Sequence, residues 1–386
     1  MNSLLTTPLC TDVSRDEWLL DPAVAFLNHG SFGATPRAVL AEQERWRGLV
    51  ERHPTHFMSE ELPPALRAAA ARLAAFVDAR ADDLVFVENA TAGCNAVLRS
   101  LRFAPGDEIL VTDHGYPAVR KAAEYVAARA GARVVEATVP FPLHDAKQAV
   151  AAVSSQLSSR TRLAIVDHIA SSTAVVFPVG ELTALCRAAG VPVLIDGAHA
   201  PGMLSLDVPS IGADWYTGNC HKWLMAPKGS AFLWVAPHRQ ADTHPLVISH
   251  GYGQSFTAEF DWVGTRDPSA WLSVPAAIDF HERLGGTQLR ERNAALAREQ
   301  ATLLARTWKT ARGAPDALTG SMATVRLPLT EPATAERALE LRRKLFDEHR
   351  VEALVTAFAD ALWVRISAHA YNRPADYARL AACFHP

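Results

Sequence analysis

Short apolar runs rich in valine and isoleucine alternate with stretches whose apolar residues recur at helical spacing, and this pattern continues up to Val235. The helical spacing is clear in Ala118–Arg129 and Val179–Ala189. This alternation predicts a mostly parallel sheet covered by helices on both faces, because parallel strands need crossover connections and are buried on both sides. Seven runs support the prediction: Leu84–Val87, Glu108–Val111, Arg133–Glu136, Leu163–Val166, Pro192–Ile195, Trp215–Thr217 and Ala231–Val235.

The domain organisation follows from where this pattern ends. The interval from Asp214 to Val235 leaves little room for a helix, which predicts one antiparallel neighbour in the sheet. We expect residues 1–50 to be an N-terminal segment that packs with a small domain, 51–275 a large domain and 276–386 a small α+β C-terminal domain. The other expected elements are a loop over Ser14–Gly33, helices over Pro36–Val50, Pro268–Leu284, Thr287–Thr310 and Thr334–His349, strands over Ala323–Leu327 and Leu362–Ile366, and a last helix from Arg373.

The composition is that of an ordinary globular chain, with 49% hydrophobic residues, 20% charged residues and a formal net charge of −3. No run of lysine and arginine indicates nucleic acid as a partner, and no apolar stretch is long enough for a membrane span. No signal peptide is visible either. Five cysteines are scattered without CxxC spacing, which is typical of reduced thiols. The sequence therefore predicts a cytoplasmic protein without nucleic-acid or membrane partners.

Two residues have the types and places that carbonyl chemistry requires. Asp196 ends a buried strand, at the edge where parallel sheets bind ligands. Lys222 follows the next strand in an apolar context, where an ammonium loses proton affinity and becomes nucleophilic. Taken singly, they could be a helix-capping acid and a surface lysine. Together they match the needs of pyridoxal phosphate, which requires a lysine for its aldehyde and a carboxylate for its ring nitrogen.

A phosphate group would also need hydrogen-bond donors. The segment Glu88–Asn95 follows a strand and opens a helix, so the Thr91 hydroxyl and main-chain amides such as that of Ala92 would lie at its positive end. Asn219 and His221, close to the lysine, are further candidate donors. The alternative interpretation of the threonine is an ordinary helix cap. The histidines show no paired ligand spacing, so no metal site is predicted.

On these residues the chain resembles fold-type I pyridoxal-phosphate enzymes of the class V aminotransferase superfamily, and within it the isopenicillin-N-epimerase-like group. The resemblance extends over most of the chain, and DGAHA followed by GNCHKW is a specific combination. It implies an α/β fold with a mostly parallel seven-stranded sheet and a smaller α+β C-terminal domain. The matching passages are FLNHGSFGATP at 26–36, ENATAGCNAVLRSL at 88–101, VPVLIDGAHAPG at 191–202, ADWYTGNCHKWLMAPKGSAFL at 213–233 and FDWVGTRDPSAW at 260–271.

The resemblance implies roles around the cofactor ring. Lys222 would hold the aldehyde and act as acid and base at the α-carbon of an amino-acid substrate. Asp196 would pair with the ring nitrogen, and His199 would lie near the phenolic oxygen. An aromatic side chain should cover the ring, and Tyr116 is expected there rather than His114.

It also implies how the phosphate and the substrate are held. Thr91, Asn219 and His221 would bind the phosphate, together with Thr265 of a neighbouring subunit, which implies a homodimer with shared active sites. Arg365 would receive the substrate α-carboxylate through paired hydrogen bonds, and a surface ion pair is the alternative. The last candidates, which could equally be turn residues, line the same pocket: Asn28 and His29.

The reaction type stays open at this level. Val351–Val364 contains no cysteine, which argues against the persulfide chemistry of cysteine desulfurases. Reprotonation, transamination and loss of a β-substituent can all follow removal of the α-proton, and the choice depends on which acid stands on which face. We expect an epimerase-like enzyme first, a C–S lyase second and an aminotransferase third. The non-enzymatic alternative is a scaffold or cofactor-binding protein of the same fold.

Overall fold

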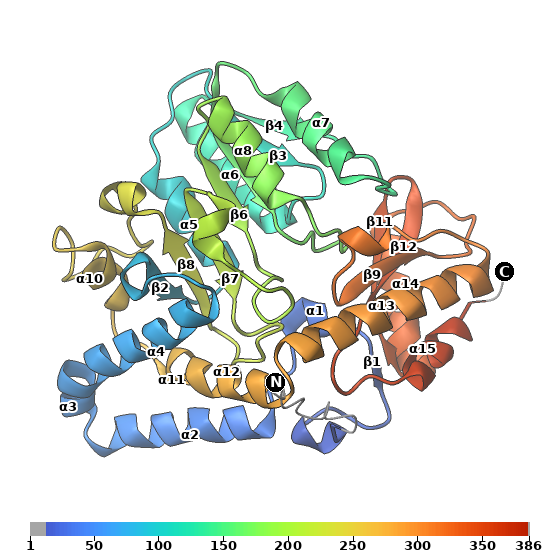
Figure 1. Ribbon diagram of the computed structural model, residues 1–386, viewed down its shortest axis with the longest axis horizontal. Helices are drawn as coiled ribbons and strands as arrows, with labels where there is room; N and C mark the ends of the chain where they lie inside the picture. Colours follow the sequence, from blue (N-terminus) through green and yellow to red (C-terminus); the bar gives the residue numbers. More distant parts are fainter. Residues whose placement is uncertain (1–12, 385–386) are drawn as a thin grey trace, which may run out of the picture.

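The computed structural model describes residues 13–384, and a seven-stranded sheet lies at the centre of its larger part (Figure 1). The strand order is β2-β8-β7-β6-β5-β3-β4, and all neighbours are parallel except that β8 is antiparallel to β2 and β7. The expected mostly parallel sheet is confirmed. Its strands are β2 (Leu84–Val87), β3 (Glu108–Thr112), β4 (Arg133–Ala137), β5 (Thr161–Asp167), β6 (Val193–Asp196), β7 (Trp215–Asn219) and β8 (Ala231–Val235).

Helices cover both faces of this sheet. Successive strand residues point to opposite faces, so Leu110 belongs to one apolar core while Ile109 and Val111 belong to the other. Burial on both sides explains why the strands are apolar along their whole length. The first core includes residues of α4 (Leu62–Phe76), α7 (Ala146–Gln156), α8 (Val179–Ala188) and α12 (Val274–Arg283), and the second includes residues of α5 (Ala90–Ser100), α6 (Pro117–Ala130) and α10 (Phe256–Asp261).

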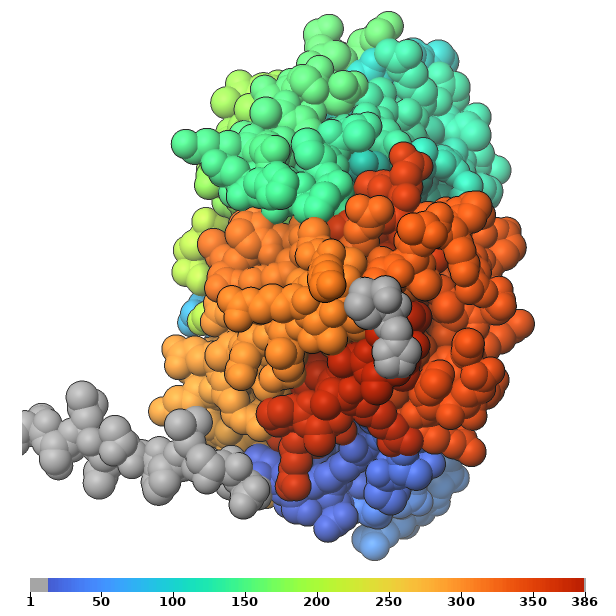
Figure 2. Space-filling view, turned by 90° about the vertical axis from the view of Figure 1, so that its right-hand side faces the viewer, coloured from blue at the N-terminus to red at the C-terminus, as the bar shows by residue number. Residues whose placement is uncertain are grey.

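The C-terminal part forms a smaller antiparallel sheet in the order β11-β12-β9. A third apolar core lies between this sheet and its helices. Figure 2 shows this part, coloured orange to red, between the green and the blue parts of the chain. Its elements are α13 (Thr287–Trp308), β9 (Met322–Arg326), α14 (Ala335–His349), β10 (Val351–Glu352), β11 (Leu354–Phe358), β12 (Ala361–Ser367) and α15 (Pro374–Ala381).

The N-terminal residues contact both parts of the molecule. Strand β1 (Ala25–Phe26) pairs in parallel with β10, whereas α2 (Arg37–Arg52) packs against α11 (Ser269–Leu272) and α12. Within the segment 1–50, β1 therefore packs with the small C-terminal part as expected, whereas α2 packs against α11 and α12. Residues 1–12 of that segment lie outside the described part of the chain. The domain limits at residues 51 and 276 stay a prediction.

Several elements differ from the expectations. The single helix expected over Pro268–Leu284 is two helices, α11 and α12, that meet at Ser273. Pro275 lies in the first turn of α12, where its missing N–H is tolerated but a preceding helix cannot continue through it. The loop expected before Gly33 contains β1 and the short helix α1 (His29–Phe32). Within residues 13–384, no helix is long and apolar enough to cross a membrane.

Candidate active site

A cavity of about 460 Å³ opens at the carboxyl ends of three parallel strands, where such sheets bind ligands. Asp167, Asp196 and Asn219 are the last residues of β5, β6 and β7, and all three line it. Seven of its lining residues were predicted from the sequence as site residues: Thr91, Tyr116, Asp196, His199, Asn219, His221 and Lys222.

The Lys222 amine is enclosed by protein. The residue is 9% exposed, and its Nζ lies 3.2 Å from Nε2 of His199. Burial, together with the charge of Arg365, lowers the pKa of Lys222 from 10.5 to about 8, and the charges of Asp196 and Asp167 oppose this change. A much larger fraction of the amine is therefore neutral near physiological pH than in a surface lysine, and the neutral amine is the nucleophilic form.

Two buried carboxyl groups lie on neighbouring strands of the site. Asp167 and Asp196 pair in register across β5 and β6, and both are buried. Burial raises the pKa of Asp196, and burial together with the charge of Asp196 raises that of Asp167. Sequence reasoning missed Asp167. The available signal was its place directly after the run Leu163–Val166, which puts it at the same edge of the sheet as Asp196.

His199 is a neutral imidazole between the lysine and a tryptophan. Its Nε2 faces the Lys222 amine, and Trp223 Nε1 donates a long hydrogen bond of 3.5 Å to its Nδ1. Burial, reinforced by the charge of Lys222, holds the pKa of His199 well below its usual value. It can therefore exchange hydrogen bonds with a ligand beside Lys222 without adding charge to the site.

The start of α5 offers fewer free donors than the sequence indicated. Asn219 Oδ1 accepts the Ala90 main-chain N–H at 2.8 Å, and the Asn89 side chain caps the helix by accepting that of Ala92 at 2.9 Å. The amide of Ala92 is therefore engaged, and this residue lines a neighbouring pocket instead of the cavity. The donors that remain available to an anion are Thr91 and the side-chain nitrogen of Asn219.

His221 has one ring nitrogen available to a ligand. Its Nδ1 donates to the carbonyl oxygen of Ser230 at 3.0 Å, which leaves Nε2. Burial lowers the pKa of His221 to about 4, and the charge of Lys222 contributes to that lowering. A neutral ring protonated at Nδ1 carries no proton on Nε2, so His221 donates to an anion only after a second proton binds. A phosphate beside it would favour that proton by raising the pKa.

Arg365 is a buried cation that has no acidic partner among residues 13–384. It lies on β12 and is fully buried behind Ser31 and Ser171, which line the cavity. Nη1 donates to the Ser171 carbonyl at 2.6 Å, and Nη2 donates to Asn28 Oδ1 at 2.9 Å and to Ser31 Oγ at 3.0 Å. Nε has no hydrogen-bond partner within residues 13–384. Burial lowers the pKa of Arg365 to about 9. The alternative of a surface ion pair is therefore wrong.

The short helix α1 is wedged between Arg365 and the main chain of Lys222. His29 Nε2 donates to the carbonyl oxygen of Lys222 at 3.0 Å, and the Tyr371 hydroxyl donates to its Nδ1 at 2.7 Å. This assignment holds because a carbonyl oxygen can only accept. Neither residue expected to line the substrate pocket does so: Asn28 contacts Arg365, and His29 supports the backbone beneath the lysine.

The residues considered for covering the ring and for the partner's phosphate differ in how they relate to the cavity. Tyr116 lines it and is 41% exposed. His114, the alternative for covering the ring, is buried and bonded to Thr173 and to the Val139 carbonyl. Thr265 is exposed and does not line the cavity of its own chain.

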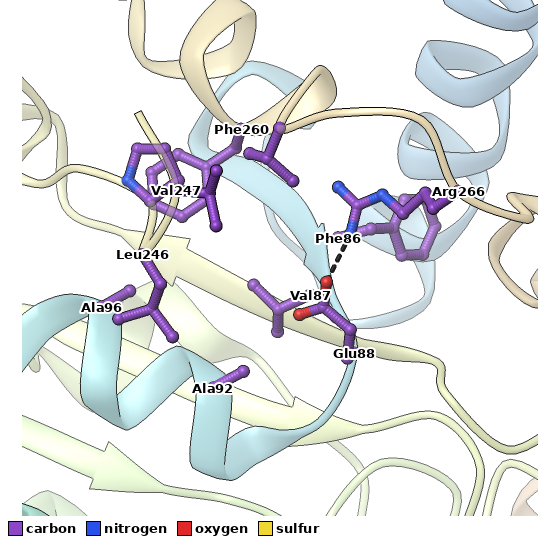
Figure 3. Close-up of a pocket in the computed structure, with 11 residues that line it drawn as sticks. Phe86, Val87, Glu88, Ala92, Ala96, Leu246, Val247, Phe260 and Arg266 are labelled. Carbon is purple, nitrogen blue, oxygen red and sulfur yellow. Dashed lines mark hydrogen bonds and ion pairs between the residues drawn. The ribbon is translucent and has the colours of Figure 1, made fainter. Parts of the chain in front are cut away.

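Figure 3 shows a small apolar pocket lined in part by Glu88. Glu88 also lines the cavity around Lys222, so the two adjoin at this residue. Arg266 closes one side of it through an ion pair with Glu88, and its guanidinium lies 3.8 Å from the ring centroid of Trp271. The rest of the lining is apolar, including Leu246 and Val247. Among residues 13–384, no three His, Cys, Asp or Glu side chains gather in a way that could hold a metal ion.

The fold and this cavity define a class of enzyme, and comparison with known proteins agrees. The family model for aminotransferase class-V matches residues 32–380. A probable chloroplastic L-cysteine desulfhydrase of Arabidopsis thaliana is 36% identical, over 93% of this chain and 82% of that protein. The isopenicillin N epimerase of Amycolatopsis lactamdurans is also 36% identical, over 95% of this chain and 96% of that protein. The solved structure of the cystine C–S lyase C-DES has a TM-score of 0.78 at 24% identity and covers 94% of this chain and 98% of its own.

The chain belongs to the aminotransferase class-V family and is a pyridoxal-phosphate-dependent enzyme. The residues present fit that cofactor: a buried amine with a lowered pKa, a buried acid on the neighbouring strand end and unengaged donors near the start of α5 surround one cavity. When bound, the cofactor supplies an electron-withdrawing ring that stabilises negative charge at the substrate α-carbon. The expected fold and cofactor are confirmed, while the role of each residue stays a proposal.

Proposed function

We propose that the protein is a C–S lyase that removes sulfide from cysteine or a small cysteine derivative, with Lys222 as its acid and base. Loss of a β-substituent needs one acid–base group, which takes the α-proton and can return a proton to the departing sulfur. The cavity holds one such positioned amine. The balanced reaction converts cysteine and water to pyruvate, ammonia and hydrogen sulfide. Relatives named as cysteine desulfhydrases, at 36 to 38% identity, support this choice.

An epimerase would need a second acid placed on the opposite face of the substrate carbanion. Tyr116 is the candidate, because it lines the cavity near the expected ring position. Its side chain is 41% exposed, and no partner in the described part of the chain holds its hydroxyl group in place. Two relatives named as isopenicillin N epimerases, each 36% identical, keep inversion as the second candidate.

The residues around Lys222 have separate tasks in this proposal. Arg365 binds the substrate α-carboxylate, because its positive charge is buried among neutral partners and gains most from an anion. Asp196 holds the ring nitrogen, and His199 contacts the phenolic oxygen. The phosphate is held by Thr91, Asn219 and His221.

The test is incubation of the purified, cofactor-loaded chain with L-cysteine in heavy water. We expect sulfide and pyruvate in equal amounts, lost in Lys222→Ala and retained in Lys147→Ala, which changes an exposed lysine. Deuterium at an inverted α-carbon without sulfide would establish an epimerase instead. A keto acid that retains sulfur would establish an aminotransferase, and a protein that takes up no cofactor would refute the site itself.

We also propose that the enzyme is a cytoplasmic homodimer with shared active sites. Leu246, Val247, Ile248 and Tyr252 form an exposed apolar segment, between 47 and 62% exposed, beside the small pocket at Glu88. Thr265 lies outside its own cavity, which suits a contribution to the partner's phosphate site. Mixing Lys222→Ala chains with Thr265→Ala chains should restore one complete site per mixed dimer and part of the activity. Monomers in light scattering would refute the dimer.

A further inference from the structure

The buried pair of carboxyl groups at the ends of β5 and β6 is not fully used by the proposed function, which assigns a task to Asp196 alone. Asp167 and Asp196 are register neighbours on parallel strands, and both line the cavity. Asp196 Oδ1 accepts the main-chain N–H of Ala198 at 3.0 Å, and Asp167 Oδ2 lies beside Gly115, just before Tyr116, where an added Cβ would be 3.5 Å from it. The second carboxyl group therefore touches the turn that presents the expected ring-covering side chain.

The charges around this pair do not balance if both groups are ionised. The groups that face Asp167 are Asp196 on β6, the Lys222 amine and the buried Cys94 thiol on α5. In the loaded site the cofactor aldehyde takes the Lys222 amine, so the protonated ring would be the one positive charge left opposite the pair, and two carboxylates would leave one negative charge unpaired. Two adjacent buried carboxyl groups meet this problem by sharing one proton, because the second ionisation is strongly disfavoured.

We propose that Asp167 is a positioning residue that carries the single proton of this pair, so that Asp196 alone bears the charge that meets the cofactor ring, while Asp167 anchors the turn at Tyr116. This inference rests on the proposed cofactor site and deepens it. It assigns opposite protonation states to two chemically identical side chains at neighbouring strand ends. The direction of the pKa of Asp167, raised by burial and then by the charge of Asp196, agrees with it.

The first experiment compares cofactor affinity in Asp167→Asn and Asp196→Asn, measured by absorbance during cofactor uptake by the full chain. Asparagine resembles a protonated aspartate in shape and charge, so Asp167→Asn should bind within about threefold of the original protein. Asp196→Asn removes the working charge and should bind at least about tenfold more weakly. Equal losses in both variants, or a larger loss in Asp167→Asn, would overturn the assignment.

The second experiment uses the cofactor-free chain and does not depend on the proposed activity. An acid whose folded pKa is raised destabilises the folded state as pH rises above its unfolded value, which is about 4. Asp167→Asn removes that cost, so its thermal midpoint should exceed the original at neutral pH and match it near pH 4. The exposed Asp82→Asn is the control. A lower midpoint at neutral pH would show an ionised Asp167 and contradict the proposal.

A third measurement covers the case in which Asp167→Asn does not fold. The infrared spectrum of the unmodified chain at neutral pH should contain the carbonyl band of a protonated carboxylic acid. Absence of that band would overturn the inference without any variant. If the chain takes up no cofactor, the proposed function fails, but the pH dependence of Asp167→Asn still decides the protonation state of Asp167, and a missing infrared band still overturns the inference.

Discussion

Replacing Lys222 by methionine is expected to stabilise the cofactor-free protein while it abolishes the chemistry. Burial lowers the pKa of this amine from 10.5 to about 8. At 1.36 kcal/mol per pKa unit, holding the charged amine in the folded site costs about 3 kcal/mol. Methionine is uncharged, flexible and apolar, so it fills the same space without that cost. The figure is an upper value, because replacing the lysine also removes the positive charge that stabilises the Asp196 carboxylate.

The pH dependence of this effect has a definite sign. At neutral pH the amine is protonated in most folded and in nearly all unfolded molecules, so most of the cost is present. Above pH 10.5 it is neutral in both states, and the cost disappears. The stability advantage of Lys222→Met should therefore be greatest below pH 8. It should decrease to zero between pH 8 and pH 10.5.

Urea unfolding of the cofactor-free chain measures this advantage directly. Lys147→Met is the matched control, since that lysine is exposed and its replacement removes a charge without relieving burial. Equal slopes of free energy against urea would show that the comparison reports stability and not a changed unfolded state. The reasoning is refuted if Lys222→Met is less stable than the original at neutral pH, or if its advantage persists unchanged at pH 10.5.

Two further predictions concern the helix α1 and its supports. Gly33→Ala should lower the thermal midpoint markedly, because Gly33 has φ +72° and an added Cβ would lie 2.1 Å from the His221 carbonyl oxygen; a midpoint within error of the original would contradict this close approach. Tyr371→Phe removes the donor to His29 Nδ1 and leaves a buried acceptor unpaired, so the free energy of unfolding should fall by about 1–3 kcal/mol in urea titration, and an unchanged value would show that the hydrogen bond does not form.

The sequence predicted the central sheet well because burial on both faces leaves a strong local signal. The limits expected for β8 are those of the structure, and Asp196 and Lys222 line one cavity as the order of the strands required. Asp167 was missed because a single acid after an apolar run looks like any strand end. Its significance arises only from its register with Asp196, which a sequence does not display.

Other features were hidden because they depend on contacts between distant segments. The apolar run around Asn28 and His29 does not reveal that one side chain faces Arg365 and the other the backbone of Lys222, residues far away in the chain. Likewise the amide of Ala92 is a free donor by position but is engaged by the Asn89 side chain. Local patterns therefore identified the residue types at the site, and tertiary packing determined which of their atoms remain available.

The two buried cations of the site influence each other, and this gives a last prediction. The charge of Arg365 contributes to the lowered pKa of Lys222, so Arg365→Met should raise that pKa above about 8, whereas Arg365→Lys keeps a charge and should leave it low. The rate at which the cofactor-free chain captures pyridoxal phosphate depends on the neutral amine, and its pH midpoint reports this pKa. A midpoint that stays constant in Arg365→Met would show that burial alone makes Lys222 reactive. An upward displacement would mean that Arg365, the residue proposed to bind the substrate carboxylate, also prepares the lysine. Neutralisation of Arg365 by a bound carboxylate would then change the basicity of the group proposed to take the α-proton.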